Sequence, residues 1–132
     1  PFKHLRATPS RPLKTKSSER QIPLVGASFS AAKRIIAHQT NYAFPKYIRN
    51  KQLNSISASA AINKWLKPRV PDGCVVHSFR HSLRDRLRSV ECPSDIVDAL
   101  GGWTTANVGQ KYGIGYDLKV KQKWLKRIVV HG

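Results

Sequence analysis

Acidic residues, cysteine and methionine are scarce in this sequence, and long apolar runs are absent from it. The 132 residues include seven Asp and Glu, two Cys and no Met. Cys74 and Cys92 are too few for a disulfide-rich scaffold, so we expect a reduced, intracellular setting. No run reaches the roughly 18 apolar residues of a transmembrane helix, so we expect no membrane partner.

The start of the chain also lacks a charged leader followed by an apolar stretch, so we expect no signal peptide. The sequence begins at Pro1 rather than at a methionine. We therefore expect a fragment or a processed product, of the size of one ordinary domain or of part of a larger one.

Basic residues dominate the charge. Lys and Arg number 24, which gives a formal net charge of +17. Such a charge opposes compaction, and binding to a polyanion such as nucleic acid relieves it. The basic residues are spread along the chain, which suits a surface that follows a DNA backbone. On charge alone, a purely architectural binder is as good an interpretation as an enzyme. The hydrophobic fraction of 40% is too high for a disordered basic tail.

The coarse pattern predicts a mainly α fold with a small β-hairpin. Alternating residues around a polar centre predict the hairpin at about residues 11–24, and a helical body follows over 28–111. Within that body we expect Ser28 or Ser30 to begin a helix, Ser55 to begin a second, and Pro93 to begin another that Gly101 and Gly102 end. A last helix is expected at about 117–130, with packing on its own body and docking on a neighbouring protomer both open.

The helix expected over 77–91 has the strongest pattern. Phe79, Leu83, Leu87 and Val90 form one apolar stripe, as a buried face requires. The basic residues occupy a different face, which by itself is typical of a solvated helix. They are His77, Arg80, Arg84 and Arg88.

Three short motifs follow in order: His77-Ser78-Phe79-Arg80, then Leu100-Gly101-Gly102-Trp103, then Tyr112. Trp103 lies 23 residues after Arg80, and Tyr112 lies nine residues after Trp103. This ordered set on a strongly basic chain resembles the carboxy-terminal catalytic part of the tyrosine recombinase (phage integrase) family. The predicted hairpin, with Lys14 and Lys16, is similar to the hairpin that carries a catalytic lysine in that family. The resemblance covers roughly residues 10–128.

The resemblance implies a DNA breaking-rejoining fold that cleaves DNA through a 3′-phosphotyrosyl intermediate. It implies Tyr112 as nucleophile, Arg80 and Trp103 on the phosphate, His77 in proton transfer and Lys14 as the acid for the leaving oxygen. It implies no cofactor and no metal, double-stranded DNA as partner, assembly into a homo-oligomer, most simply a tetramer, and a cytoplasmic, bacterial or phage-encoded protein. We expect further DNA contacts from Lys16, Arg84, Arg88 and Lys111.

One part of the family pattern is missing. The family has a further essential arginine upstream of the hairpin, and neither Arg6 nor Arg11 fits that place. We therefore expect these residues to be the carboxy-terminal portion of an integrase catalytic domain, inactive alone.

Four alternatives stay open. Tyr116 is a rival nucleophile. His77 and His81, with Cys74 and Cys92, are conceivable zinc ligands, although no Cys-x-x-Cys pair is present. A type IB topoisomerase-like enzyme and a non-catalytic nucleic-acid-binding domain are the competing functions.

Overall fold

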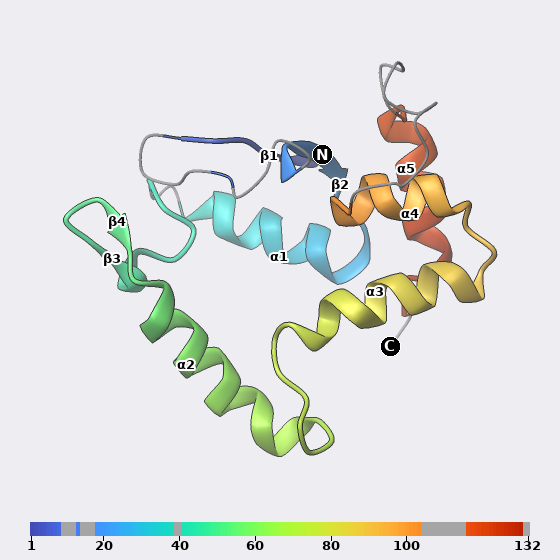
Figure 1. The fold of residues 1–132 in the computed structure, drawn as a ribbon. Helices are drawn as coiled ribbons and strands as arrows, with labels where there is room; N and C mark the ends of the chain where they lie inside the picture. The colour runs from blue at the N-terminus through green and yellow to red at the C-terminus, as the bar shows by residue number, and fades with distance from the viewer. Residues whose placement is uncertain (9–12, 14–17, 39–40, 104–115, 131–132) are drawn as a thin grey trace.

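The computed structural model describes residues 1–8, 13, 18–38, 41–103 and 116–130. Its elements run β1 (Phe2–Leu5), β2 (Arg20–Pro23), α1 (Gly26–Ala37), η2 (Pro45–Tyr47), β3 (Ile48–Arg49), β4 (Gln52–Leu53), α2 (Ser55–Leu66), η3 (Lys67–Arg69), α3 (Ser78–Ser89), α4 (Ser94–Gly101) and α5 (Leu118–Arg127). Figure 1 shows the helices as the bulk of the fold, with short strands at its edge. The predicted mainly α class is confirmed.

The amino-terminal sheet differs from the predicted hairpin. β2 lies where the second arm was expected, but it pairs with β1 in an antiparallel register that places Phe2 opposite Pro23 and Leu5 opposite Arg20. The first arm of the predicted hairpin, just before the polar centre, falls mostly among residues that lie outside the described ones. Alternation within one segment indicates a strand but cannot identify its partner, which tertiary contacts select. Residues 9–12 and 14–17 lie outside the described residues.

A second small sheet lies in the segment that the sequence indicated only as a connection. β3 and β4 pair antiparallel across Asn50 and Lys51. Both of these residues have positive φ angles, 49° and 63°. Positive φ at both central residues is what a two-residue hairpin requires, and asparagine tolerates it better than most residues. The Asn50-Lys51 pair was therefore a readable turn signal.

Helix starts depend on side chains near the first turn. α1 begins at Gly26, earlier than expected, and Ser28 lies inside its first turn. The Ser28 hydroxyl accepts from the Val25 N–H at 3.1 Å and donates to the Val25 carbonyl at 2.7 Å. Asn54 rather than Ser55 caps α2, because its Oδ1 accepts from the Ser57 N–H at 3.0 Å. Asp117 caps α5, the helix that was expected from about residue 117. These bonds satisfy backbone donors that a helix leaves unpaired.

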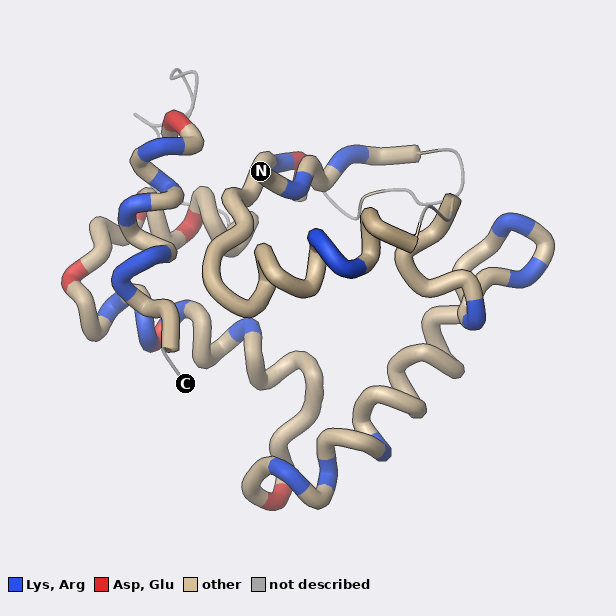
Figure 2. The backbone as a smooth tube through the Cα atoms, turned by 180° about the vertical axis from the view of Figure 1, so that it is seen from behind, with Lys and Arg blue, Asp and Glu red and all other residues tan. Residues whose placement is uncertain are grey.

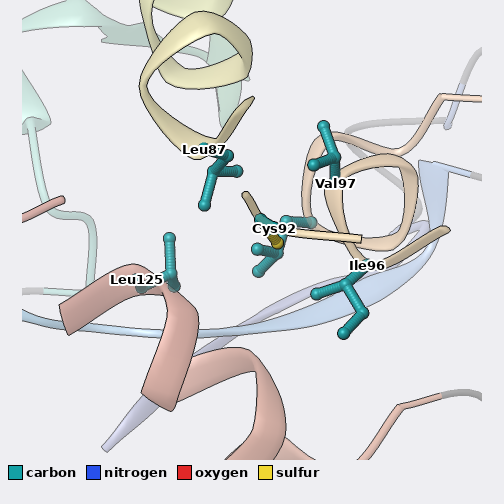
Figure 3. Packing of buried hydrophobic residues seen from close by; sticks show 6 residues of the cluster. Leu87, Cys92, Ile96, Val97 and Leu125 are labelled. Carbon is teal, nitrogen blue, oxygen red and sulfur yellow. The ribbon is translucent and has the colours of Figure 1, made fainter. Parts of the chain in front are cut away.

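The core lies between α3, α4 and α5. Leu87 is fully buried, and Leu100 is only 1% exposed. In Figure 3, Leu87, Ile96 and Leu125 lie around Cys92. The apolar side of α4 is buried at Ile96, Val97 and Leu100. The carboxy-terminal helix packs on its own body, because Leu125 joins this core and α5 lies against β2.

Several apolar residues on the helices remain exposed. The exposed fractions are 74% for Ile36, 82% for Ile56 and 60% for Phe79, so the expectation that Phe79 belongs to a buried stripe was wrong. In Figure 1, α2 extends away from the α3–α5 core. Helical periodicity marks a face that can be buried, but whether another element covers it depends on the tertiary arrangement.

None of the helices in the described ranges is both long enough and apolar enough to span a membrane.

Candidate active site

Arg80 and Trp103 come together at the carboxy-terminal end of α4. Arg80 extends from α3, and its Nη1 donates to the Gly101 carbonyl at 2.7 Å. Its guanidinium carbon lies 4.4 Å from the centroid of the Trp103 ring. The two family motifs, 23 residues apart in the sequence, thus meet through a hydrogen bond and a cation–π contact.

Backbone geometry fixes Trp103 in this position. Gly102 ends α4 in the left-handed region with φ of 66°, and the Trp103 N–H donates to the Asp98 carbonyl at 3.1 Å. A methyl group at Gly101 would lie 1.8 Å from a carbon of the Trp103 ring. The two glycines are therefore needed, one for the turn and the other for the space that the indole occupies.

Arg84 lies on the same side of α3, one turn after Arg80. Its guanidinium carbon is 5.1 Å from the Trp103 ring centroid. Its Nε is buried and has no hydrogen-bond partner within the described residues. Burying such a donor without a partner costs free energy, and a bound anion would satisfy it. This places the predicted DNA contact Arg84 at the same site as Arg80.

Arg20 is the residue of this site that the sequence analysis missed. It is the first residue of β2, and its Nε donates to the Leu100 carbonyl at 3.0 Å. Burial, and then the positive charge of Arg80, lowers the pKa of Arg20 below its ordinary value. The neighbouring Lys121 on α5 also has a lowered pKa, because of burial and then the Arg20 charge. No local signal distinguished Arg20 from the other basic residues, because only the fold brings β2 against α4.

Of the remaining predicted site residues, the structure describes His77 and Arg88. His77 precedes the first turn of α3, where its carbonyl accepts from the Arg80 N–H at 2.9 Å. Its ring lies edge-on to that of His81, with centroids 5.3 Å apart. Arg88 is exposed on α3. The other four lie outside the described residues: Lys14, Lys16, Lys111 and Tyr112.

The alternatives can be compared with the same geometry. The Tyr116 hydroxyl donates to a carboxylate oxygen of Asp95 on α4. Cys92 is buried in the core, away from the two histidines of the zinc alternative, whereas Cys74 is partly exposed. Among the described residues, no group of three or more His, Cys, Asp or Glu could hold a metal ion.

Positive charge accompanies this site over much of the surface. Figure 2 shows basic residues on α3 and α5 and on the turn between β3 and β4. Within the described residues, His4 lies 3.7 Å from Glu19, which makes an ion pair when the histidine is protonated. The excess of 24 basic over seven acidic residues leaves most of the positive charge to interact with an external polyanion.

The chain is basic and mainly helical, and it brings Arg80 and Arg84 together at Trp103. These features are typical of a protein that binds the phosphates of nucleic acid. The family model for the phage integrase family matches residues 4–114. The chain belongs to this family of tyrosine recombinases. No match was found among curated proteins or among solved structures.

The electrostatic argument predicts a steep salt dependence of DNA binding. Each phosphate that the protein neutralises contributes a slope of about 0.9 in log affinity against log salt. Arg84→Ala is expected to lower the slope by about 0.9, because Arg84 has a buried donor free for a phosphate. Titrations of residues 1–132 with duplex DNA at several salt concentrations measure this. A DNA affinity that is the same at all salt concentrations would contradict the electrostatic argument. Arg34→Ala, on the exposed face of α1, is the matched control.

Proposed function

We propose that this protein is a site-specific recombinase that breaks and rejoins DNA strands through Tyr112. Family membership implies site-specific recombination and DNA binding. The observation that carries the residue assignment is the convergence of Arg80 on Gly101 and Trp103. It brings together a guanidinium, which can pair with a phosphate in a bidentate manner, and an indole, whose N–H can donate, from two segments that the sequence separates.

The proposed reaction is a transesterification at one DNA phosphate. The Tyr112 oxygen attacks phosphorus, the bond from phosphorus to the 5′-oxygen breaks, and a 3′-phosphotyrosyl bond forms. The Tyr112 proton leaves to a base, and the departing 5′-oxygen takes a proton from an acid. In the reverse step a different 5′-hydroxyl attacks the phosphotyrosyl bond and releases Tyr112, so strands are exchanged without loss of bond energy.

The side chains have distinct proposed roles. Arg80 pairs with two non-bridging oxygens and stabilises the charge that develops on them. Trp103 donates its indole N–H to one of these oxygens. His77, one turn before Arg80, accepts or donates the proton near neutral pH. Lys14 protonates the leaving oxygen, with Lys16 as the alternative because the hairpin register there is not described.

The DNA partner is proposed to be double-stranded. Lys16, Arg84, Arg88 and Lys111 are proposed to contact its backbone, outside the reacting phosphate. Exchange between two duplexes needs several active sites, which supports assembly into a homo-oligomer, most simply a tetramer, on DNA. Such a protein acts in the cytoplasm of a bacterial cell.

A nicked suicide duplex tests this function. Cleavage releases a short strand from such a substrate, so the covalent protein–DNA product cannot be resealed and accumulates. The assay is made on the full-length protein. We expect a covalent adduct that Tyr112→Phe abolishes and that Tyr116→Phe retains.

The other outcomes identify the competing functions. Binding without any adduct marks a non-catalytic DNA-binding domain. An adduct that reseals its own strand but never joins a second duplex marks a topoisomerase-like enzyme. An adduct that survives Tyr112→Phe and disappears with Tyr116→Phe would move the nucleophile to Tyr116.

A further inference from the structure

Arg20 lies outside every motif that the function uses, yet its side chain enters the active site. Its Nε donates to the Leu100 carbonyl at 3.0 Å, and its Nη1 donates to the Ser18 carbonyl at 2.9 Å. The guanidinium therefore connects the start of β2 to the carboxy-terminal end of α4. Two bonds in different directions restrict its orientation, which a single bond would not do.

Arg20 and Arg80 hold adjacent carbonyls of the same turn. Arg20 donates to Leu100 and Arg80 donates to Gly101. These carbonyls belong to the end of a helix, where unpaired oxygens and the helix dipole favour positive charge. The guanidinium groups of Arg20 and Arg80, which come from β2 and α3, can therefore lie near each other at the turn before Trp103.

The glycine after α4 provides room for this arrangement. A methyl group at Gly102 would lie 2.4 Å from Arg20 Nη1 and 2.7 Å from its guanidinium carbon. Gly102 therefore has a second role besides its positive φ, because it lets the Arg20 guanidinium lie directly against the backbone.

The charges support the same interpretation. The pKa of Arg20 is lowered by burial first and by Arg80 second, and Lys121 on α5 adds to the positive charge around Arg20. The groups facing Arg20 are thus the Arg80 guanidinium from α3, the Lys121 ammonium from α5 and the carbonyls of α4. Mutual repulsion of this kind is relieved when a phosphate binds at Arg80.

We propose that Arg20 is a positioning residue for DNA cleavage, which fixes the turn Leu100–Trp103 and thereby orients Arg80 on the phosphate. The proposal rests on the recombinase function above. In this role Arg20 acts through the turn. It connects the Ser18 and Leu100 carbonyls without needing to contact DNA itself.

Single-turnover cleavage of the nicked duplex by the full-length protein tests the proposal. With saturating DNA, Arg20→Ala and Arg20→Lys are both expected to slow cleavage by roughly 10- to 100-fold, because small misplacements of catalytic groups have effects of this size. Lysine keeps the charge but cannot bridge two carbonyls. DNA affinity of Arg20→Lys is expected to change less than about threefold, and its salt slope is expected to stay unchanged.

Chemical rescue separates positioning from general loss of structure. We expect millimolar methylguanidinium to restore part of the cleavage rate of Arg20→Ala, relative to the same concentration of sodium chloride. Arg49→Ala, which removes an exposed arginine from β3, is the charge-matched control and is expected to cleave at the wild-type rate.

A second pair of variants tests the geometry with Arg20 still present. Gly102→Ala puts a methyl group on the Arg20 guanidinium and is expected to slow cleavage about as much as Arg20→Ala. Gly73→Ala introduces alanine at a similar positive φ of 81°, but no atom lies within 4 Å of its added carbon. It is expected to lower stability without slowing cleavage at saturating DNA.

The results distinguish the inference from the function. A wild-type protein that forms no adduct rejects the recombinase function itself. An active wild type with an Arg20→Lys variant of equal rate overturns the positioning role. A salt slope lowered by about 0.9 in Arg20→Lys or Arg20→Ala would make Arg20 a direct phosphate ligand and would also overturn it.

Discussion

Arg80→Lys is expected to slow DNA cleavage by about 10²- to 10³-fold, the range measured when one preorganised donor to a developing negative charge is removed. Arginine at this position donates to the Gly101 carbonyl and stacks on Trp103, and it has further N–H groups to pair with a phosphate. A lysine ammonium is a single point of charge that cannot make these contacts together.

The measurement is single-turnover cleavage of the nicked duplex by the full-length protein, with duplex affinity determined in parallel. Arg34→Lys is the matched control, because Arg34 is an exposed arginine on α1. We expect the Arg80 effect in the cleavage rate rather than in affinity, since the contact strengthens as charge develops. A rate for Arg80→Lys within a few-fold of wild type would contradict the assignment of Arg80 to the reacting phosphate.

Leu87→Ala is expected to destabilise the fold by about 3–5 kcal/mol, as truncation of fully buried leucines does when the cavity cannot collapse. Leu87 is 0% exposed and packs in the cluster that joins α3 to α4 and α5. The loss is a large part of the roughly 5–15 kcal/mol that stabilises a typical domain, so the transition should also shift to much lower temperature.

Urea unfolding of residues 1–132 measures this free energy. Phe79→Ala provides the control on the same helix, because Phe79 belongs to the same sequence stripe yet is 60% exposed. We expect less than about 1 kcal/mol for Phe79, as for surface substitutions in general. Equal losses for the two variants would mean that the α3–α5 core is not the centre of the fold.

Several features were readable from local sequence. The α3 stripe located Leu87, and Pro93 marked the start of α4. Gly102 was expected at the end of a helix, and it ends α4 with a positive φ. The motifs around Arg80 and Trp103 predicted the candidate site because their order and spacing are specific, although each motif alone carries little information.

Other features depended on long-range contacts. β2 pairs with β1, a partner that the sequence analysis did not identify, since alternation defines a strand without defining its neighbour. Phe79 was expected in a buried stripe of α3, but it is 60% exposed. A periodic apolar face indicates which residues of a helix could be buried. Burial also requires a second element that packs against that face.

The sequence by itself determined the helical class and the positive charge and nominated Arg80 and Trp103 as candidate site residues, because spacing, composition and motif order are local quantities. Only the tertiary structure decided that Arg20 joins them. Its hydrogen bond to the Leu100 carbonyl spans 80 residues of sequence. No local rule connects positions so far apart, since the contact exists only when β2 packs against the end of α4 and Gly102 leaves room for a guanidinium.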